Sequence, residues 1–341
     1  MERCNVDIDR QSWTGRVDAA EGERALRWHQ RVQPLRAGHA PGVALLGFAC
    51  DAGVMRNQGK AGAAAGPAAI RRMAANLAWH GSDAAPLVDA GDVSCNGDEL
   101  EDAQAELGGR VAALLRAGHL PILLGGGHDI AWGSYQGIAA ACSDALDGYG
   151  VLNFDAHFDL RRPPGGRGNS GTAFFQIAEA LAVRRQAFRY LCIGASAAAN
   201  TRAVFDTAHR LGVQWIGDSE LIWPNFAQLT GSIDAFLDRV KLLQLSICLD
   251  ALPASVAPGV SAPAARGIAP DLFFALLDHV LRRCAGPGAR PRLALAEIAE
   301  CNPAVDREDM TSRLAARIGF EIARDVIAPG MARTPAAGAP C

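Results

Sequence analysis

The sequence predicts an α/β fold with three layers, in which helices cover both faces of a central, mostly parallel β-sheet. Two observations lead to this prediction. Apolar runs of strand length alternate with segments of helical periodicity along residues 42–327. The apolar runs are also continuous, as is typical of strands that are buried on both faces. Since the pattern contains no internal repeat and no break in composition, we expect one main domain over residues 41–328.

The elements of this domain follow from the apolar runs and from their flanking residues. A strand is expected at residues 42–48, and the next helix, at residues 67–78, has Pro67 near its first turn, where proline fits a helix. A short strand at residues 87–90 and a long helix at residues 100–117 come next. The other strands are expected, in chain order, at residues 120–124, 150–154, 190–193, 213–216, 241–249 and 292–298, with helical segments between most of them.

Both ends of the chain differ in composition from the main domain. Residues 1–40 are polar and mixed, but they contain Trp13, Trp28 and a helix-like stretch at residues 20–31. We interpret them as an N-terminal arm that packs on the main domain. Residues 329–341 are rich in proline, alanine and glycine, and this composition predicts a disordered tail.

Charge and cysteine content argue against several classes of protein. The formal net charge is −3, and no basic stripe favours binding to nucleic acid. The longest apolar runs have the length of strands, so we expect no segment that spans a membrane. Nine cysteines occur without a CxxC pair, and the N-terminus has no apolar signal-peptide core. We therefore expect free thiols and a cytoplasmic location.

Two short runs carry most of the chemistry, and each directly follows an apolar run. The first is Gly-Gly-Gly-His-Asp at residues 125–129, and the second is Asn-Phe-Asp-Ala-His-Phe-Asp at residues 153–159. In the second run, Asp155, His157 and Asp159 alternate, so their side chains project to one side of an extended chain. Because parallel strands end at one edge of a sheet, we expect these groups and the histidine of the first run to form a metal site there.

A third run, Gln-Leu-Ser-Ile-Cys-Leu-Asp at residues 244–250, ends another expected strand. The candidate metal ligands are then His128, Asp155, His157, Asp159, Cys248 and Asp250. Six ligands, several of them able to bridge, suit two metal ions that together hold and deprotonate one water molecule. The role of Cys248 stays open, because a free cysteine is often only a small core residue.

These three runs resemble, in order and spacing, the signature regions of the ureohydrolase family, which includes arginase and agmatinase. The segment Glu-Cys-Asn-Pro at residues 300–303 resembles the family segment whose glutamate meets the amidine or guanidine group of the substrate. The resemblance covers residues 40–327. It implies the family's α/β/α fold, a small-molecule substrate and a centre of two divalent ions, most readily Mn²⁺. Members of the family are commonly oligomeric, so a homo-oligomer is also open.

Other segments are similar to the branch of this family that hydrolyses N-formimidoyl-L-glutamate to L-glutamate and formamide in histidine degradation. They lie at residues 13–16, 26–30, 47–51, 56–59, 153–161, 169–172 and 252–263. This similarity implies the same activity for the present chain. The loop at residues 168–172 lacks the histidine that arginases use as a proton shuttle, which argues against hydrolysis of a guanidine.

Two other functions are kept as alternatives. One is a ureohydrolase that acts on agmatine, guanidinobutyrate or arginine and releases urea. The other is a metal-poor, inactive relative that serves as a binding protein. Only Cys248 supports the second alternative, because it stands where the family has a bridging aspartate. A thiolate at this position would favour zinc, iron or cobalt over manganese, or the side chain would turn away and weaken one metal site.

The resemblance also suggests roles for residues that meet the substrate. Glu300 would accept two parallel hydrogen bonds from the planar amidine, and Asp159 would carry a proton from the attacking water to the leaving nitrogen. The two carboxylates of the substrate require cationic partners, and arginine suits them best. The candidates near the motif-bearing loops are Arg56 and Arg161, with Asn57, Asn169 and Ser170 as further hydrogen-bond donors.

Overall fold

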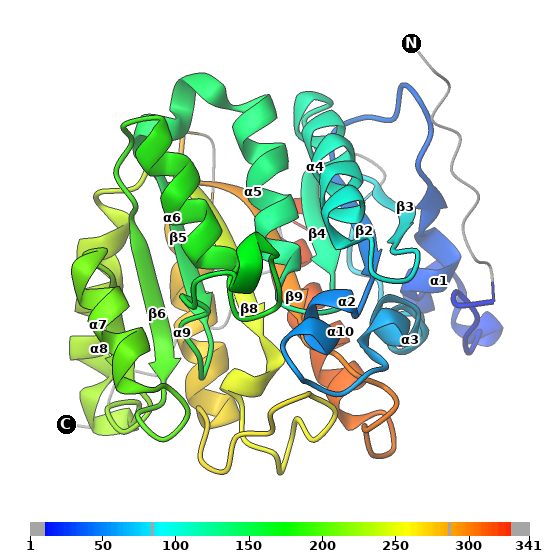
Figure 1. Cartoon of the computed structure of the whole chain (residues 1–341). Helices are drawn as coiled ribbons and strands as arrows, with labels where there is room; N and C mark the ends of the chain where they lie inside the picture. The colour runs from blue at the N-terminus through cyan, green and yellow to red at the C-terminus, as the bar shows by residue number, and fades with distance from the viewer. Residues whose placement is uncertain (1–10, 83–84, 286–287, 329–341) are drawn as a thin grey trace.

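The computed structural model describes residues 11–82, 85–285 and 288–328, and in this part of the chain nine strands form a single sheet (Figure 1). Neighbouring strands are parallel throughout. The strand order is β1-β3-β2-β4-β9-β8-β5-β6-β7. The strands are β1 (Gln33–Pro34), β2 (Val43–Ala49), β3 (Leu87–Ser94), β4 (Leu120–Leu124), β5 (Tyr149–Phe154), β6 (Tyr190–Ala195), β7 (Gln214–Gly217), β8 (Leu242–Cys248) and β9 (Arg292–Ala299).

Helices cover both faces of this sheet, as Figure 1 shows. They are α1 (Trp28–Arg31), α2 (Ala52–Arg56), α3 (Gly66–Ala74), α4 (Leu100–Arg116), α5 (Ile130–Ala141), α6 (Ala173–Val183), α7 (Arg202–Arg210), α8 (Phe226–Leu237), α9 (Pro270–Arg283) and α10 (Met310–Ile327). One apolar core contains side chains of α3, α8, α9 and α10, and a second contains those of α4, α5, α6 and α7. In β2, Val43 and Leu45 point into the first core, whereas Ala44 and Leu46 point into the second. The predicted three-layer α/β/α fold is therefore confirmed.

All the strands predicted from apolar runs are present, and β4 has the predicted bounds. The largest difference is in β3, which continues to Ser94, beyond the apolar run at residues 87–90. Its polar residues are compatible with a buried strand because Arg71 donates hydrogen bonds to both carboxylate oxygens of Asp89, each at 2.9 Å. In the part of the chain that the structure describes, no helix is both long and apolar enough to cross a membrane.

The expected helix at residues 20–31 is wrong. The segment is divided into a 3₁₀ stretch at Ala19–Ala25 and the single turn α1, because Gly22 has φ +67° and Arg27 is extended. The indole N–H of Trp13 donates to Asp89 at 2.7 Å, and Trp28 is buried in the first core. The short strand β1 also adds to the sheet, although sequence patterning did not suggest it. The tail at residues 329–341 lies outside the described residues.

The order of the central strands explains why distant motifs meet. Strands β4, β9, β8 and β5 are consecutive neighbours in the sheet, although they lie far apart in the sequence. Because they are parallel, their carboxyl ends lie at one edge. The runs at residues 125–129, 155–159 and 248–250 and the residue Glu300 all begin at or just after these four ends. The topology thus brings all the sequence motifs to one place.

Candidate metal centre and substrate cavity

The histidine of the first motif is positioned by a glycine turn that packs directly on the end of β2. A β-carbon at Gly126 would lie 1.9 Å from the carbonyl oxygen of Cys50, so only glycine fits there. The backbone N–H of Gly126 donates to the carbonyl oxygen of Phe48 at 2.9 Å. This close packing fixes the turn and directs the imidazole of His128 towards the carboxylates that follow β5.

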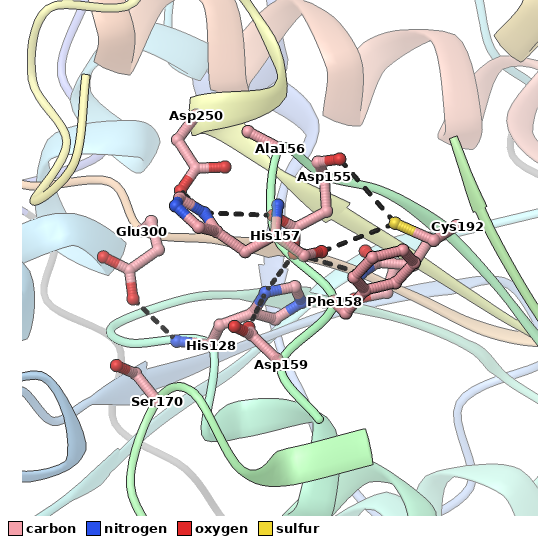
Figure 2. A network of polar contacts seen from close by, with 12 residues as sticks. His128, Asp155, Ala156, His157, Phe158, Asp159, Ser170, Cys192, Asp250 and Glu300 are labelled. Carbon is pink, nitrogen blue, oxygen red and sulfur yellow. Dashed lines mark hydrogen bonds and ion pairs between the residues drawn. The ribbon is translucent and has the colours of Figure 1, made fainter. Parts of the chain in front are cut away.

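Two groups of potential metal ligands share the carboxylate of Asp155. Figure 2 shows Asp155 with His128, His157 and Asp250. One group consists of His128, Asp155 and Cys248, and the other of Asp155, His157 and Asp250. Within each group the ligand atoms all lie within 4.8 Å of one another. Since Asp155 has one oxygen for each group, this arrangement fits two cations with a bridging carboxylate.

The distances between the ligand atoms support this arrangement. Nδ1 of His128 lies 2.9 Å from an oxygen of Asp155 and 2.9 Å from an oxygen of Asp159. Nδ1 of His157 lies 3.0 Å from Asp250 and 3.6 Å from Asp155. Asp159 therefore joins the cluster through His128, and its φ of +48° turns the chain sharply at this point. The structure brings together all six predicted ligands.

The electrostatics of the cluster favour a positive charge at its centre. Burial opposes protonation of His157, but the carboxylates of Asp250 and Asp155 raise the pKa of its imidazole to about 12. Burial also opposes ionisation of Asp155, yet His128 and His157 hold the pKa of this carboxyl well below its usual range. One oxygen of Asp250 is buried without any hydrogen-bond partner. Buried carboxylates need a cation or a donor, so the residues present fit a pair of divalent ions.

Cys248, the last residue of β8, lines the cavity at the centre of this cluster. Its side chain thus faces the candidate ligands. Burial, together with the neighbouring carboxylates of Asp155 and Asp250, raises the pKa of the thiol well above its ordinary value. A thiol in this environment keeps its proton unless a metal ion displaces it.

Glu300 follows β9 and faces the same cavity. One of its carboxylate oxygens accepts a hydrogen bond from the backbone N–H of His128 at 3.0 Å (Figure 2). Its φ of +67° is unusual for a residue other than glycine and directs the side chain away from the path of the strand. Burial, followed by repulsion from Asp250, raises the pKa of this carboxyl to about 8. Such a site favours a cationic group on the substrate beside the carboxylate.

The cavity has a volume of about 260 Å³ and is lined by polar side chains in addition to those of the metal cluster. Of the candidate substrate-binding residues, Asn57, Arg161 and Ser170 line it. Asn57 donates from Nδ2 to the hydroxyl oxygen of Ser170 at 3.1 Å, which joins two loops. Sequence analysis did not select Gln58, Asn200 and Ser261, which also line the cavity. Gln58 and Ser261 lie in segments that resemble the family branch, but the resemblance assigned them no role, and Asn200 lies in no such segment.

Two candidate substrate-binding residues do not line the cavity. Arg56 forms ion pairs with Asp98 at 2.6 Å and with Glu101 at 2.7 Å, and it also donates to the carbonyl oxygen of Gly168. Asn169 is buried and accepts a hydrogen bond from the backbone N–H of Gly171 at 2.9 Å. Both side chains therefore hold the loops that carry the cavity-lining residues.

Known proteins with similar sequences and structures are consistent with this site. Formimidoylglutamase of Chromobacterium violaceum is 47% identical over 317 residues, which cover 93% of this chain and 98% of that protein. Formimidoylglutamase of Ralstonia nicotianae is 48% identical over 333 residues, which cover 96% and 99%. The crystal structure of Trypanosoma cruzi formiminoglutamase with two Mn²⁺ ions has a TM-score of 0.71 at 26% identity and covers 85% of this chain and 94% of that chain. The model of the arginase family matches residues 41–324, and with these relatives it establishes that the chain belongs to the arginase, or ureohydrolase, family.

Proposed function

We propose that the protein hydrolyses N-formimidoyl-L-glutamate to L-glutamate and formamide with the help of two divalent metal ions. The observation that carries this proposal is the shared carboxylate of Asp155 between two ligand groups, with Glu300 beside them in one cavity. The similar relatives are formimidoylglutamases, and the chain matches them over nearly their whole length. The sequence signatures outside the metal-binding runs support the same substrate.

The metal ions, when bound, would supply a water molecule of lowered pKa and would stabilise the negative charge that develops on the substrate. His128, Asp155, Asp159 and Cys248 would hold one ion, and Asp155, His157 and Asp250 the other. Mn²⁺ is the first choice, because the similar crystal structure contains two Mn²⁺ ions. Zn²⁺ is the second, because a thiolate ligand favours it.

The residues of the chain would bind the substrate and move a proton. Glu300 would accept two hydrogen bonds from the planar amidinium and thereby place the formimidoyl carbon at the metal cluster. Asp159 would accept the proton of the attacking water and pass it to the glutamate nitrogen as that nitrogen leaves. Burial and the nearby Asp155 raise the pKa of Asp159, which favours its transient protonation.

We expect the substitution Arg161→Ala to raise KM with little change in kcat. Arg161 lines the cavity, and a hydrogen bond to a charged group contributes about 1.5–3 kcal/mol, which corresponds to roughly a 10- to 100-fold increase in KM. Steady-state kinetics with N-formimidoyl-L-glutamate measure this effect. Arg56→Ala is the matched control, because this arginine is bound to Asp98 and Glu101 and should affect thermal stability more than KM. A raised KM in Arg56→Ala, with an unchanged KM in Arg161→Ala, would instead assign substrate binding to Arg56.

The substitution Cys248→Asp should shift metal preference towards Mn²⁺. A hard carboxylate would replace a soft thiolate at the position where the family has a bridging aspartate. Reloading the metal-free protein with Mn²⁺ or Zn²⁺ and comparing activities measures the shift. Cys301→Ala is a control, because this buried cysteine lies in the apolar core and not among the ligands. An unchanged ratio of Mn²⁺ to Zn²⁺ activity in Cys248→Asp would show that the thiol is not a ligand.

The proposed substrate is tested by assaying the metal-loaded protein on several compounds. We expect glutamate from N-formimidoyl-L-glutamate and no urea from agmatine, guanidinobutyrate or arginine. Urea release without glutamate release would move the protein to the guanidine-hydrolysing branch, and no turnover of any compound would favour the inactive relative. We also infer a reducing, cytoplasmic environment. Seven cysteines of the described chain are free thiols, which supports this inference.

A further inference from the structure

Behind the metal-facing side of His128 lies a buried polar network that the proposed reaction does not use. His128 turns Nδ1 towards the carboxylates of Asp155 and Asp159. Its other ring nitrogen, Nε2, lies 2.8 Å from the hydroxyl oxygen of Ser246. The hydroxyl of Ser246 also interacts with the carboxylate of Glu297, which the register of the sheet places beside it. A path of polar contacts thus leads from a candidate metal ligand to a second, deeper carboxylate.

Glu297 is fully buried in β9, where the register of the sheet places it beside Ser246 of β8. One of its oxygens accepts a hydrogen bond from Nε2 of Gln244 at 2.9 Å, and the other accepts one from the hydroxyl of Ser134. In the described part of the chain, neither lysine nor arginine forms an ion pair with it. A carboxylate buried in this way is costly, which indicates a role beyond packing.

The direction of each hydrogen bond follows from the chemistry of a histidine ligand. A neutral imidazole that uses Nδ1 for a metal carries its only proton on Nε2. Nε2 therefore donates to Ser246, whose own O–H must then donate to another acceptor. The carboxylate of Glu297, which lies beside Ser246 in the register of the sheet, is the acceptor that we assign to it. Because the carboxylate accepts the proton of the hydroxyl, the hydroxyl oxygen is left to accept the proton on Nε2. In other metal sites a carboxylate fixes the tautomer of a histidine ligand in a similar way.

We propose that Glu297, acting through Ser246, is a positioning residue that fixes the tautomer and the ring orientation of His128 for metal binding. This inference rests on the metal centre of the proposed function, but not on the identity of the substrate. It predicts that loss of either residue of this relay, Ser246 or Glu297, weakens metal binding at the site that contains His128. The site that contains His157 and Asp250 has no contact with the relay and should keep its affinity.

Calorimetric titration of the metal-free protein with Mn²⁺ tests the proposal. In Glu297→Gln and in Ser246→Ala, the affinity of one of the two sites should fall by about 10- to 100-fold, while the other site stays as in the wild type. Ser134→Ala is the matched control, because this hydroxyl also donates to Glu297 but does not touch His128. It should bind both ions nearly as the wild type does. The double variant Ser246→Ala/Glu297→Gln should lose no more affinity than the weaker-binding single variant, because the two residues act as one unit.

Two results would overturn the proposal. One is wild-type affinity at both sites in Ser246→Ala, which stays decisive even if Glu297→Gln does not fold. The other is an equal loss in Ser134→Ala and Ser246→Ala, which would indicate a general effect on packing. Failure of the proposed function would look different. If the variants differ in metal affinity as expected but the wild type releases no glutamate, the role of Glu297 and Ser246 stands and only the proposed substrate is wrong.

Discussion

Replacing Asp155 with asparagine is expected to abolish the binding of at least one metal ion and to reduce kcat for N-formimidoyl-L-glutamate on the order of 10³-fold or more. Asp155 is the only residue that both groups of ligands share, and it is completely buried. An amide has one oxygen and no charge, so it cannot supply two ions at once. Metal analysis after dialysis and steady-state kinetics measure the two effects.

A matched control comes from a second buried aspartate of the same sheet. Asp89 pairs with Arg71 at 2.9 Å and accepts a hydrogen bond from Trp13, far along the sheet from the metal cluster. Asp89→Asn should lower the free energy of unfolding, by up to about 3–5 kcal/mol when one partner of a buried ion pair is removed, and should leave metal content unchanged. Two bound ions and normal turnover in Asp155→Asn would contradict the bridging role.

Replacing Glu300 with glutamine is expected to lower kcat/KM by roughly 10²- to 10³-fold while both metal ions remain bound. The loss reflects a charge-assisted interaction with the amidinium that a neutral amide cannot replace. The side chain contacts the backbone N–H of His128 and lines the cavity, but it belongs to neither group of ligands. Retained metal with lost activity therefore separates a substrate-binding role from a ligand role.

Glu101→Gln is the control for this second substitution, because Glu101 is an exposed carboxylate that pairs with Arg56 outside the cavity. It should change kcat/KM by much less than Glu300→Gln does. Loss of metal in Glu300→Gln would identify the residue as a ligand, and an unchanged kcat/KM would remove it from the mechanism.

The main domain could be predicted because its signals are local. Most of the buried strands coincide with an apolar run, and the run at residues 120–124 has the same bounds as β4. The arm was harder, because β1 has only two residues, one of them proline, and its pairing with β3 depends on contacts far along the chain. The helix expected at residues 20–31 fails at Gly22, where a positive φ ends the regular backbone. Local patterns do not show such tertiary effects.

In the candidate site, too, local features could be predicted from the sequence, whereas features that depend on tertiary contacts could not. The metal-binding runs could be recognised because each contains its ligands at fixed spacing after a strand. Their convergence depends on β4, β9, β8 and β5 being neighbours, which the sequence pattern alone does not determine. Arg56 illustrates the limit, because it directly precedes the cavity-lining Asn57, yet its guanidinium is bound by carboxylates of a distant segment. The relay of Ser246 and Glu297 was missed for the same reason, since its members belong to different strands.

The dimetal site is tested most directly by titrating the metal-free protein with Mn²⁺ while glutamate release from N-formimidoyl-L-glutamate is followed. We expect no glutamate release without metal and an increase in the rate that reaches its plateau at two ions per chain. Glutamate release that does not depend on metal would contradict the role of the Asp155 cluster. No release at saturating Mn²⁺ or Zn²⁺ would contradict the proposed reaction itself.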